Sequence, residues 1–274
     1  MASDSDVVGS IVSLRRYPVK SMMGEELQEC AVTDRGLLGD RAYALVDPTN
    51  SKVVSAKNPR KWGRLFDFGA SFDDSPRVGE PMPPASITFP DGARLGSDAS
   101  NLAERLSGEL SREVTFEMTA PEMPSLEEYW PDIEGLAYKE TVTDEAMPTG
   151  TFFDLAVIHI LTTSTLDRLA ELYPDGRFEV RRFRPNIFVQ PASGEVDFVE
   201  NNWIGHTLSI GDQVRLSITG GCPRCVMTTL PQGDLPKDPG ILRTAAQHNK
   251  VHVGVYASVL QGGEVRAGDP LRLE

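Results

Sequence analysis

Glycine and proline divide this chain into short segments, and this punctuation constrains its fold more than any other feature of the sequence. There are 24 glycines and 20 prolines among 274 residues. Short runs rich in apolar and β-branched residues lie between the turns, which is typical of strands. In the first hundred residues these runs are at 9–15, 27–32, 41–47, 65–71 and 86–89. We therefore predict a sheet or barrel for this part of the chain.

The second half has the same character, with a few short helices added. Thr162 opens a run of hydroxyl residues that suits a helix start, and apolar residues at 166, 169, 170 and 172 follow at helical spacing. Two further helices are expected at 101–106 and 240–248, and further strands at 152–161, 186–190, 207–210, 214–218 and 251–260. Strands and helices do not alternate regularly, which disfavours a parallel Rossmann-type sheet. The expected class is β-rich α+β.

The segment 119–150 differs in composition from the rest. It contains eight Asp and Glu residues, four prolines and a single basic residue, Lys139. We predict an exposed acidic connection here, between a first domain at 7–118 and a second at 151–274. A solvated loop and a docking surface for a basic partner explain such a run of like charge equally well.

The overall charge excludes several classes of partner. The formal net charge is −13, whereas binding to nucleic acid or to an anionic membrane surface requires a basic face. No window approaches the roughly 18 consecutive apolar residues of a membrane helix, and the acidic start lacks the features of a signal peptide. We therefore expect a soluble, cytoplasmic protein that binds neither nucleic acid nor membrane. Three cysteines do not make a disulfide framework.

Two of these cysteines, Cys222 and Cys225, follow a pair of glycines and have C-x-x-C spacing. Arg224 between them is expected to favour the Cys225 thiolate, because a neighbouring positive charge stabilises the ionised form. One interpretation is a dithiol redox pair, although such pairs normally lie at a helix start in a βαβ unit. A second is a zinc site completed by His248 and His252, although the 22 residues before His248 exceed the usual gap of about 12–15. A third is two ordinary buried cysteines.

A fourth interpretation is a single thiolate that binds a transition metal carried by an organic cofactor. Such a cofactor is anionic, so an acidic protein has to build a local basic pocket for it. Lys20, Arg41, Arg184 and Arg224 provide candidate cations. For each of them taken alone, a surface residue or the partner of a carboxylate is the better explanation.

Five motifs, in this order, resemble those of a known family: YPVKS at 17–21, GDRAYALV at 39–46, FRPNI at 183–187, RCVMTT at 224–229 and GDP at 268–270. The chain is similar to MOSC proteins with the associated N-terminal β-barrel, the group that contains the mitochondrial amidoxime-reducing component and its bacterial relatives. The resemblance extends over nearly all of residues 8–273. It implies an N-terminal MOSC-associated β-barrel lobe followed by a MOSC β-barrel lobe, with the molybdenum cofactor, a molybdopterin, between them.

The resemblance also implies roles for individual residues. Cys225 matches the molybdenum-ligating cysteine of the family and is therefore the expected catalytic residue and metal ligand, whereas Cys222 is expected to be a packed neighbour. Residues expected to contact the cofactor are Lys20, Ser21, Arg41, Asp154, Thr162, Arg184, Asn186, Arg224 and Tyr256. The match at Asp154 and Thr162 is looser than at the others. Binding of pyridoxal phosphate stays open as a further possibility.

By the same resemblance, we expect a molybdenum-dependent oxidoreductase that reduces N-hydroxylated small molecules such as hydroxylamines and amidoximes. We expect this chain to function without the C-terminal ferredoxin domain of many bacterial relatives and without the membrane anchor of the mitochondrial form. Electrons are therefore expected from a separate ferredoxin-, flavodoxin- or cytochrome-type protein with its reductase. The alternatives are a molybdenum-cofactor carrier, a sulfur-transfer protein with a persulfide on Cys225, and a barrel that has lost its cofactor and serves as an interaction module.

Overall fold

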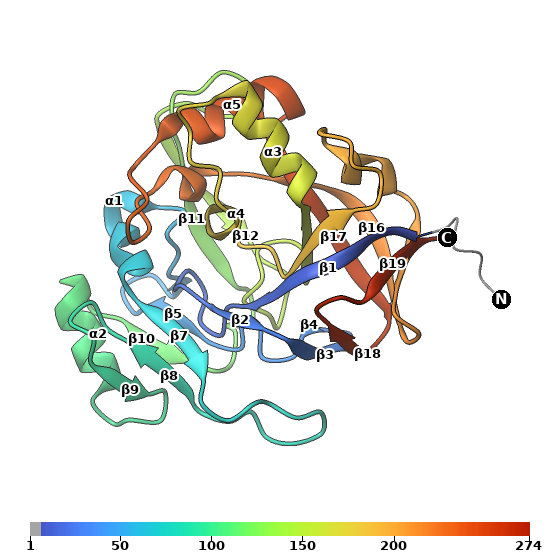
Figure 1. The fold of residues 1–274 in the computed structure, drawn as a ribbon. Helices are drawn as coiled ribbons and strands as arrows, with labels where there is room; N and C mark the ends of the chain where they lie inside the picture. The colour runs from blue at the N-terminus through green and yellow to red at the C-terminus, as the bar shows by residue number, and fades with distance from the viewer. Residues whose placement is uncertain (1–6) are drawn as a thin grey trace.

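A closed β-barrel brings the first and last strands together in this computed structural model, which describes residues 7–274 (Figure 1). Seven of the strands within that range form the ring, and β1 closes it by pairing with β19 on one side and β14 on the other. All neighbours are antiparallel except β13 and β14. In ring order the strands are β14 (Ile187–Pro191), β13 (Ile158–Thr162), β17 (His252–Gln261), β16 (Val214–Pro223), β15 (Thr207–Ile210), β19 (Pro270–Leu273) and β1 (Val7–Arg16).

Apolar side chains that alternate along these strands fill the barrel. Ile11, Ile160, Ile187, Leu216 and Val255 are all fully or almost fully buried in one cluster. Residues i and i+2 of a strand share a face, so short alternating runs suffice to build this core. The β-rich class and barrel architecture predicted from the sequence are confirmed.

The first strand connects the two predicted domains. β1 belongs to the first part of the chain but lies in the ring formed by the second, with Gly9 opposite both Pro191 and Leu271. The boundaries at residues 118 and 151 stay a prediction. In the structure, the N-terminal and C-terminal parts of the chain are joined through β1.

Most of the rest of the N-terminal half forms small sheets around a second core, which contains Trp62, Phe66, Phe68, Phe89 and Leu106. Of the three sheets that follow, the third packs on the barrel core instead. One sheet is β7 (Gly69–Phe72), β8 (Ala85–Thr88) and β9 (Arg94–Gly96), and a second is β10 (Thr115–Glu117), β5 (Ala44–Asp47) and β6 (Lys52–Val53). A third combines β3 (Glu29–Thr33) and β4 (Gly36–Leu37) with β18 (Gly263–Arg266), while β2 (Glu25–Leu27) extends β1.

The helices are short and lie mostly on one side of the barrel (Figure 1). Their bounds are α1 (Pro59–Trp62), α2 (Leu102–Leu110), α3 (Thr163–Leu172), α4 (Val180–Phe183) and α5 (Pro239–Asn249), with 3-10 helices η2 (Gly63–Asp67), η3 (Val199–Trp203) and η4 (Val226–Thr229). The predicted cap of α3 is confirmed, because the Thr162 side chain accepts a hydrogen bond from the Thr165 amide at 3.1 Å. No helix within residues 7–274 has the length and apolar character needed to cross a membrane.

Two predicted strands are shorter in the structure. The run at 65–71 begins as η2 and becomes extended only at β7, because Leu65 and Phe66 pack into the core from a helical turn. The run at 152–161 is extended only in β13. Its first residues form a loop whose Phe152 carbonyl accepts a hydrogen bond from Lys20.

The segment predicted to be an exposed acidic connection contains a β-hairpin of β11 (Ser125–Trp130) and β12 (Thr141–Ala146). Basic residues at 52–61 pair with four of its acidic side chains, of which Glu127 and Glu128 are largely buried whereas Glu140 and Asp144 stay exposed. The ion pairs are Lys52 with Asp144 (2.6 Å), Lys61 with Glu127 (2.8 Å), Lys57 with Glu128 (2.9 Å) and Arg60 with Glu140 (3.2 Å).

Candidate functional site

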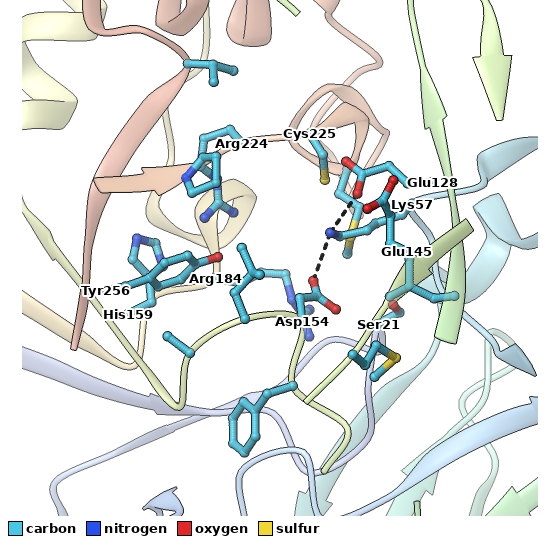
Figure 2. A pocket seen from close by; sticks show the side chains of 18 of the residues that line it. Ser21, Lys57, Glu128, Glu145, Asp154, His159, Arg184, Arg224, Cys225 and Tyr256 are labelled. Carbon is cyan, nitrogen blue, oxygen red and sulfur yellow. Dashed lines mark hydrogen bonds and ion pairs between the residues drawn. The ribbon is translucent and has the colours of Figure 1, made fainter. Parts of the chain in front are cut away.

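A cavity of about 410 Å³ lies where the barrel, the loops of the N-terminal half and the β11–β12 hairpin meet (Figure 2). Nine of the ten residues predicted for the site line it: Lys20, Ser21, Arg41, Asp154, Arg184, Asn186, Arg224, Cys225 and Tyr256. Thr162 is not brought to the cavity. Its hydroxyl caps α3 and donates to the buried carboxylate of Glu200 at 2.7 Å.

Cys225 follows the end of β16 and directly precedes η4, and its side chain points into the cavity (Figure 2). Burial raises the pKa of the Cys225 thiol to about 11, although Lys57 and Arg224 act in the opposite direction. Arg224 thus acts in the expected direction and favours the Cys225 thiolate, but burial has the larger effect on the pKa of this thiol. The free energy needed to remove a thiolate from water is larger than the Coulomb stabilisation that these two cations provide.

The Arg224 side chain contacts the other cysteine. Its Nη1 donates to Cys222 Sγ at 2.6 Å and its Nη2 donates to the Phe183 carbonyl at 2.8 Å. Cys222 is fully buried, so the hydrogen bond to its sulfur orients the guanidinium from behind the cavity wall. The buried Nε of Arg224 has no hydrogen-bond partner among the described residues.

Two arginines form a cationic centre on the cavity floor. Arg41 and Arg184 both stack on the ring of Tyr17, with guanidinium-to-centroid distances of 4.7 and 4.1 Å. Burial and the proximity of Arg41 lower the pKa of Arg184 to about 10. Asn186 supports this centre, since its amide donates to Asp40 at 2.9 Å and Asp40 also pairs with Arg41.

Three of the predicted residues have an unusual backbone. Ser21, Arg41 and Arg184 adopt φ values of 65, 48 and 54°, a left-handed conformation that is uncommon for residues with a Cβ. Such conformations persist only where surrounding contacts enforce them, and they concentrate at functional sites. Their presence at three positions of one cavity supports its assignment as the site.

Lys57 connects two carboxylates on the other side of the cavity (Figure 2). Its Nζ lies 2.9 Å from Glu128 Oε2 and 3.3 Å from Asp154 Oδ2. Burial alone would lower the pKa of Lys57, but Asp154, Cys225 and Glu128 together raise it well above its usual value. Burial opposes ionisation of Asp154, yet Lys20 and Lys57 hold its pKa far below the usual range. Burial raises the pKa of Glu128.

His159 lies beside Tyr256 on the barrel side of the cavity, with ring centroids 6.0 Å apart. Its Nε2 donates to the Val253 carbonyl at 3.0 Å. Burial, followed by the charge of Arg224, lowers the pKa of His159 to about 3, so the imidazole is neutral at physiological pH. Gly254, with φ of 83°, makes room for the ring, because a Cβ there would lie 2.3 Å from His159 Nε2.

Sequence reasoning missed several residues that line the cavity, notably Lys57, Glu128, Glu145 and His159. Lys57 lies outside every motif, so no local signal identifies it. Glu128 was detectable, because Leu126, Glu128 and Trp130 alternate with outward-facing residues as a half-buried strand does.

The zinc interpretation finds no support, since no group of three or more His, Cys, Asp or Glu side chains within residues 7–274 is placed to hold a metal ion. Any metal bound at Cys225 would therefore have to bring most of its ligands with it. Phosphate-bearing cofactors that carry a metal meet this requirement, and the surrounding cations suit their charge.

Comparison with known proteins identifies two domains in the chain. The model of the MOSC domain matches residues 149–272, and the model of the MOSC N-terminal beta barrel domain matches residues 8–65. The chain is 26% identical to mitochondrial amidoxime reducing component 2 of Rattus norvegicus, with 96% of this chain and 83% of that protein covered. It is 28% identical to mitochondrial amidoxime-reducing component 1 of Xenopus laevis, with 98% and 83% covered.

Two solved structures are also similar. The YuaD protein of Bacillus subtilis aligns with a TM-score of 0.48 and 12% identity, over 97% of this chain and 95% of that one. YiiM of Geobacillus stearothermophilus aligns with a TM-score of 0.33 and 21% identity, over 43% of this chain and 54% of that one. The two domain matches stand in the order and at the positions that the five motifs indicate. The chain therefore belongs to the MOSC-domain proteins that carry an N-terminal MOSC beta-barrel domain.

Proposed function

We propose that this protein is a molybdenum cofactor-dependent reductase of N-hydroxylated compounds such as hydroxylamines and amidoximes. One observation carries the proposal: a partly exposed thiol and five cationic side chains, drawn from both halves of the chain, line a single cavity. The MOSC domain family is associated with binding of the molybdenum cofactor. The relatives named amidoxime reducing components supply the substrate class.

The residues of the cavity fit a molybdopterin. Lys20, Arg41, Lys57, Arg184 and Arg224 outnumber the lining carboxylates Glu128, Glu145 and Asp154, so an anion would relieve the excess of buried positive charge. The unpartnered Nε of Arg224 is a donor awaiting an acceptor. Molybdenum is thiophilic, and Cys225 is the only thiol of the described residues that lines the cavity.

In this assignment Cys225 holds the metal, and Lys20, Ser21, Arg41, Arg184 and Arg224 hold the pterin and its phosphate. The cofactor, when bound, supplies a metal that stores and releases two electrons. The overall reaction converts R–NH–OH, two electrons and two protons into R–NH₂ and water. We propose that the electrons come from a separate ferredoxin-, flavodoxin- or cytochrome-type protein.

The chain prepares the site in two ways. The cavity wall leaves the Cys225 thiol only partly exposed, so a group held there would be partly shielded from water. Lys57 is an ammonium group between Glu128 and Asp154 and lies close enough to Cys225 to lower its pKa, so it holds a proton at Nζ near the thiol. Neutral His159 packs against Tyr256 and adds no charge to this region.

The test is Cys225→Ser, with Cys222→Ser as the matched control. Both proteins are expressed in a cofactor-competent host, and their molybdenum content and their reduction of benzamidoxime by dithionite-reduced methyl viologen are measured. We expect Cys225→Ser to lose activity by roughly two orders of magnitude or more, because ligand changes exceed the 10- to 100-fold effect of supporting residues. Cys222→Ser should keep most of the activity, since a hydroxyl also accepts from Arg224. Wild-type turnover by Cys225→Ser, or wild-type protein without molybdenum, would contradict the assignment.

A further inference from the structure

The β11–β12 hairpin forms one wall of the cavity and differs in charge from the wall opposite. Figure 2 shows Glu128 and Glu145 on one side, and Arg224, His159 and Tyr256 on the other. The register of the hairpin places Leu126 opposite Glu145 and Trp130 opposite Thr141. Alternation along both strands therefore turns Leu126, Glu128, Trp130 and Glu145 toward the cavity.

The outer face of the same hairpin is neutralised by the N-terminal half. Glu127 and Asp144 both pair with Lys52. On the inner face Glu128 pairs with Lys57. Three carboxylates line the cavity: Glu128, Asp154 and Glu145. Within residues 7–274, no cationic side chain lies within ion-pair distance of Glu145.

Hydrogen bonds hold Glu145 in place beside an aromatic ring. Trp130 Nε1 donates to Thr143 Oγ1 at 2.7 Å, and Thr143 Oγ1 donates to Glu145 Oε1 at 2.6 Å. The Trp130 ring is braced from outside by Tyr138, at a centroid distance of 5.3 Å and an interplanar angle of 64°. The carboxylate and the indole are thus positioned together on the cavity side of the hairpin.

The loop end of the hairpin also contributes to the cavity wall. Gly135, Leu136 and Ala137 of the connecting loop line the cavity. Next to this loop, the Tyr129 amide donates a hydrogen bond to the Lys57 carbonyl at 2.9 Å, which ties the hairpin to the N-terminal half. This bond lies one residue from Trp130 and helps to fix the position of the indole on the wall.

We infer that Trp130 and Glu145 select substrates that carry a positive charge on the side away from the N–O bond. The inference rests on the proposed function, in which the anionic cofactor engages Lys20, Arg41, Arg184 and Arg224. The charge left facing a substrate is then the unpaired carboxylate of Glu145. An aromatic face beside a carboxylate favours cations, and above all quaternary ammonium groups, through combined cation–π and Coulomb attraction.

The experiment compares two benzamidoximes of nearly equal shape, one with a 4-trimethylammonium group and one with a 4-tert-butyl group. The ratio of their kcat/KM values, cation over neutral, is measured for the holoenzyme with reduced methyl viologen. We expect the wild-type protein to prefer the cation, and Glu145→Gln and Trp130→Leu each to lower the ratio about fivefold, as expected for a partly exposed charge or cation–π contact. Asp144→Asn makes the same change of net charge on the outer face and should leave the ratio unchanged.

Equal kcat/KM values for the two substrates with the wild-type protein would overturn the inference. So would equal shifts of the ratio in Glu145→Gln and Asp144→Asn, because only long-range charge would then be acting. Calorimetric titration with phenyltrimethylammonium, which has no N–O bond, separates this inference from the proposed function. Binding that is weakened about fivefold by Glu145→Gln, in a protein that reduces neither benzamidoxime, would support the cation site and reject the reductase. If the protein reduced the benzamidoximes but did not bind phenyltrimethylammonium, the reductase would be supported and the cation site rejected.

Discussion

Replacing Lys57 by methionine tests whether the acidic wall of the cavity depends on one buried cation. The Lys57 side chain is 14% exposed and that of Glu128 is 9% exposed, with Nζ and Oε2 separated by 2.9 Å. Asp154 keeps Lys20 as a partner, whereas Glu128 loses the only cation with which it pairs among the described residues. Breaking a buried pair by removing one partner typically costs about 3–5 kcal/mol. Because Glu128 can respond by taking up a proton, we expect a loss of about 3 kcal/mol at pH 7.

Urea unfolding followed by tryptophan fluorescence measures this loss, in protein from a host that lacks the cofactor so that bound ligand does not contribute. The double variant Lys57→Met with Glu128→Leu should recover at least about half of it, because an apolar pair of similar volume often replaces a buried ion pair at little cost. Lys139→Met is the control, since Lys139 and its partner Asp132 are 61% and 62% exposed and such pairs contribute at most about 1 kcal/mol. A Lys57→Met protein within about 0.5 kcal/mol of wild type, or a double variant whose loss equals the sum of the two single losses, would refute the reasoning.

Two further substitutions report on pH dependence and on a helix cap. Burial and Arg224 lower the pKa of His159 to about 3, below the ordinary 6.5, so the unfolded chain takes up a proton that the folded chain refuses. Stability should therefore fall as pH drops from about 6.5 toward 3, by up to about 1.4 kcal/mol per pH unit. His159→Gln should flatten the urea midpoint against pH between about 6 and 4.5, whereas replacement of the exposed His206 should not; an unchanged slope in His159→Gln would contradict the burial argument. Thr162→Val should cost about 1–3 kcal/mol through the lost cap and the bond to Glu200 without changing molybdenum content. Loss of molybdenum at unchanged stability would instead place Thr162 at the cofactor.

The residues of the site were predicted through the resemblance to the MOSC family, because several of them lie in the short motifs that carry that resemblance. Taken alone, no local pattern assigned Lys20, Arg41 or Arg184 to a site. Nine of the ten predicted residues line the cavity. The exception, Thr162, serves as the helix cap that the hydroxyl run also indicated.

The remaining features depend on distant partners, which no local pattern reveals. The ion pairs between the acidic segment and residues 52–61 join residues 66 to 92 positions apart, so they appear only in the fold. Adjacency in sequence indicated correctly that Arg224 favours the Cys225 thiolate. It did not reveal that the guanidinium bonds to Cys222 or that burial has the larger effect on the pKa of the Cys225 thiol.

Closure of the barrel by β1 also governs the order in which the protein can fold. During synthesis β1 leaves the ribosome early, but its partners β14 and β19 appear only after most of the chain, since Gly9 pairs with Pro191 and with Leu271. Such long-range pairings slow folding, because the loop must be closed before the contacts that stabilise it can form. Until then β1 presents two open edges and the C-terminal strands lack one member of the ring, which exposes both to mispairing with other chains. Expression of the C-terminal half alone should therefore require chaperones or yield aggregates, even though it contains six of the seven barrel strands.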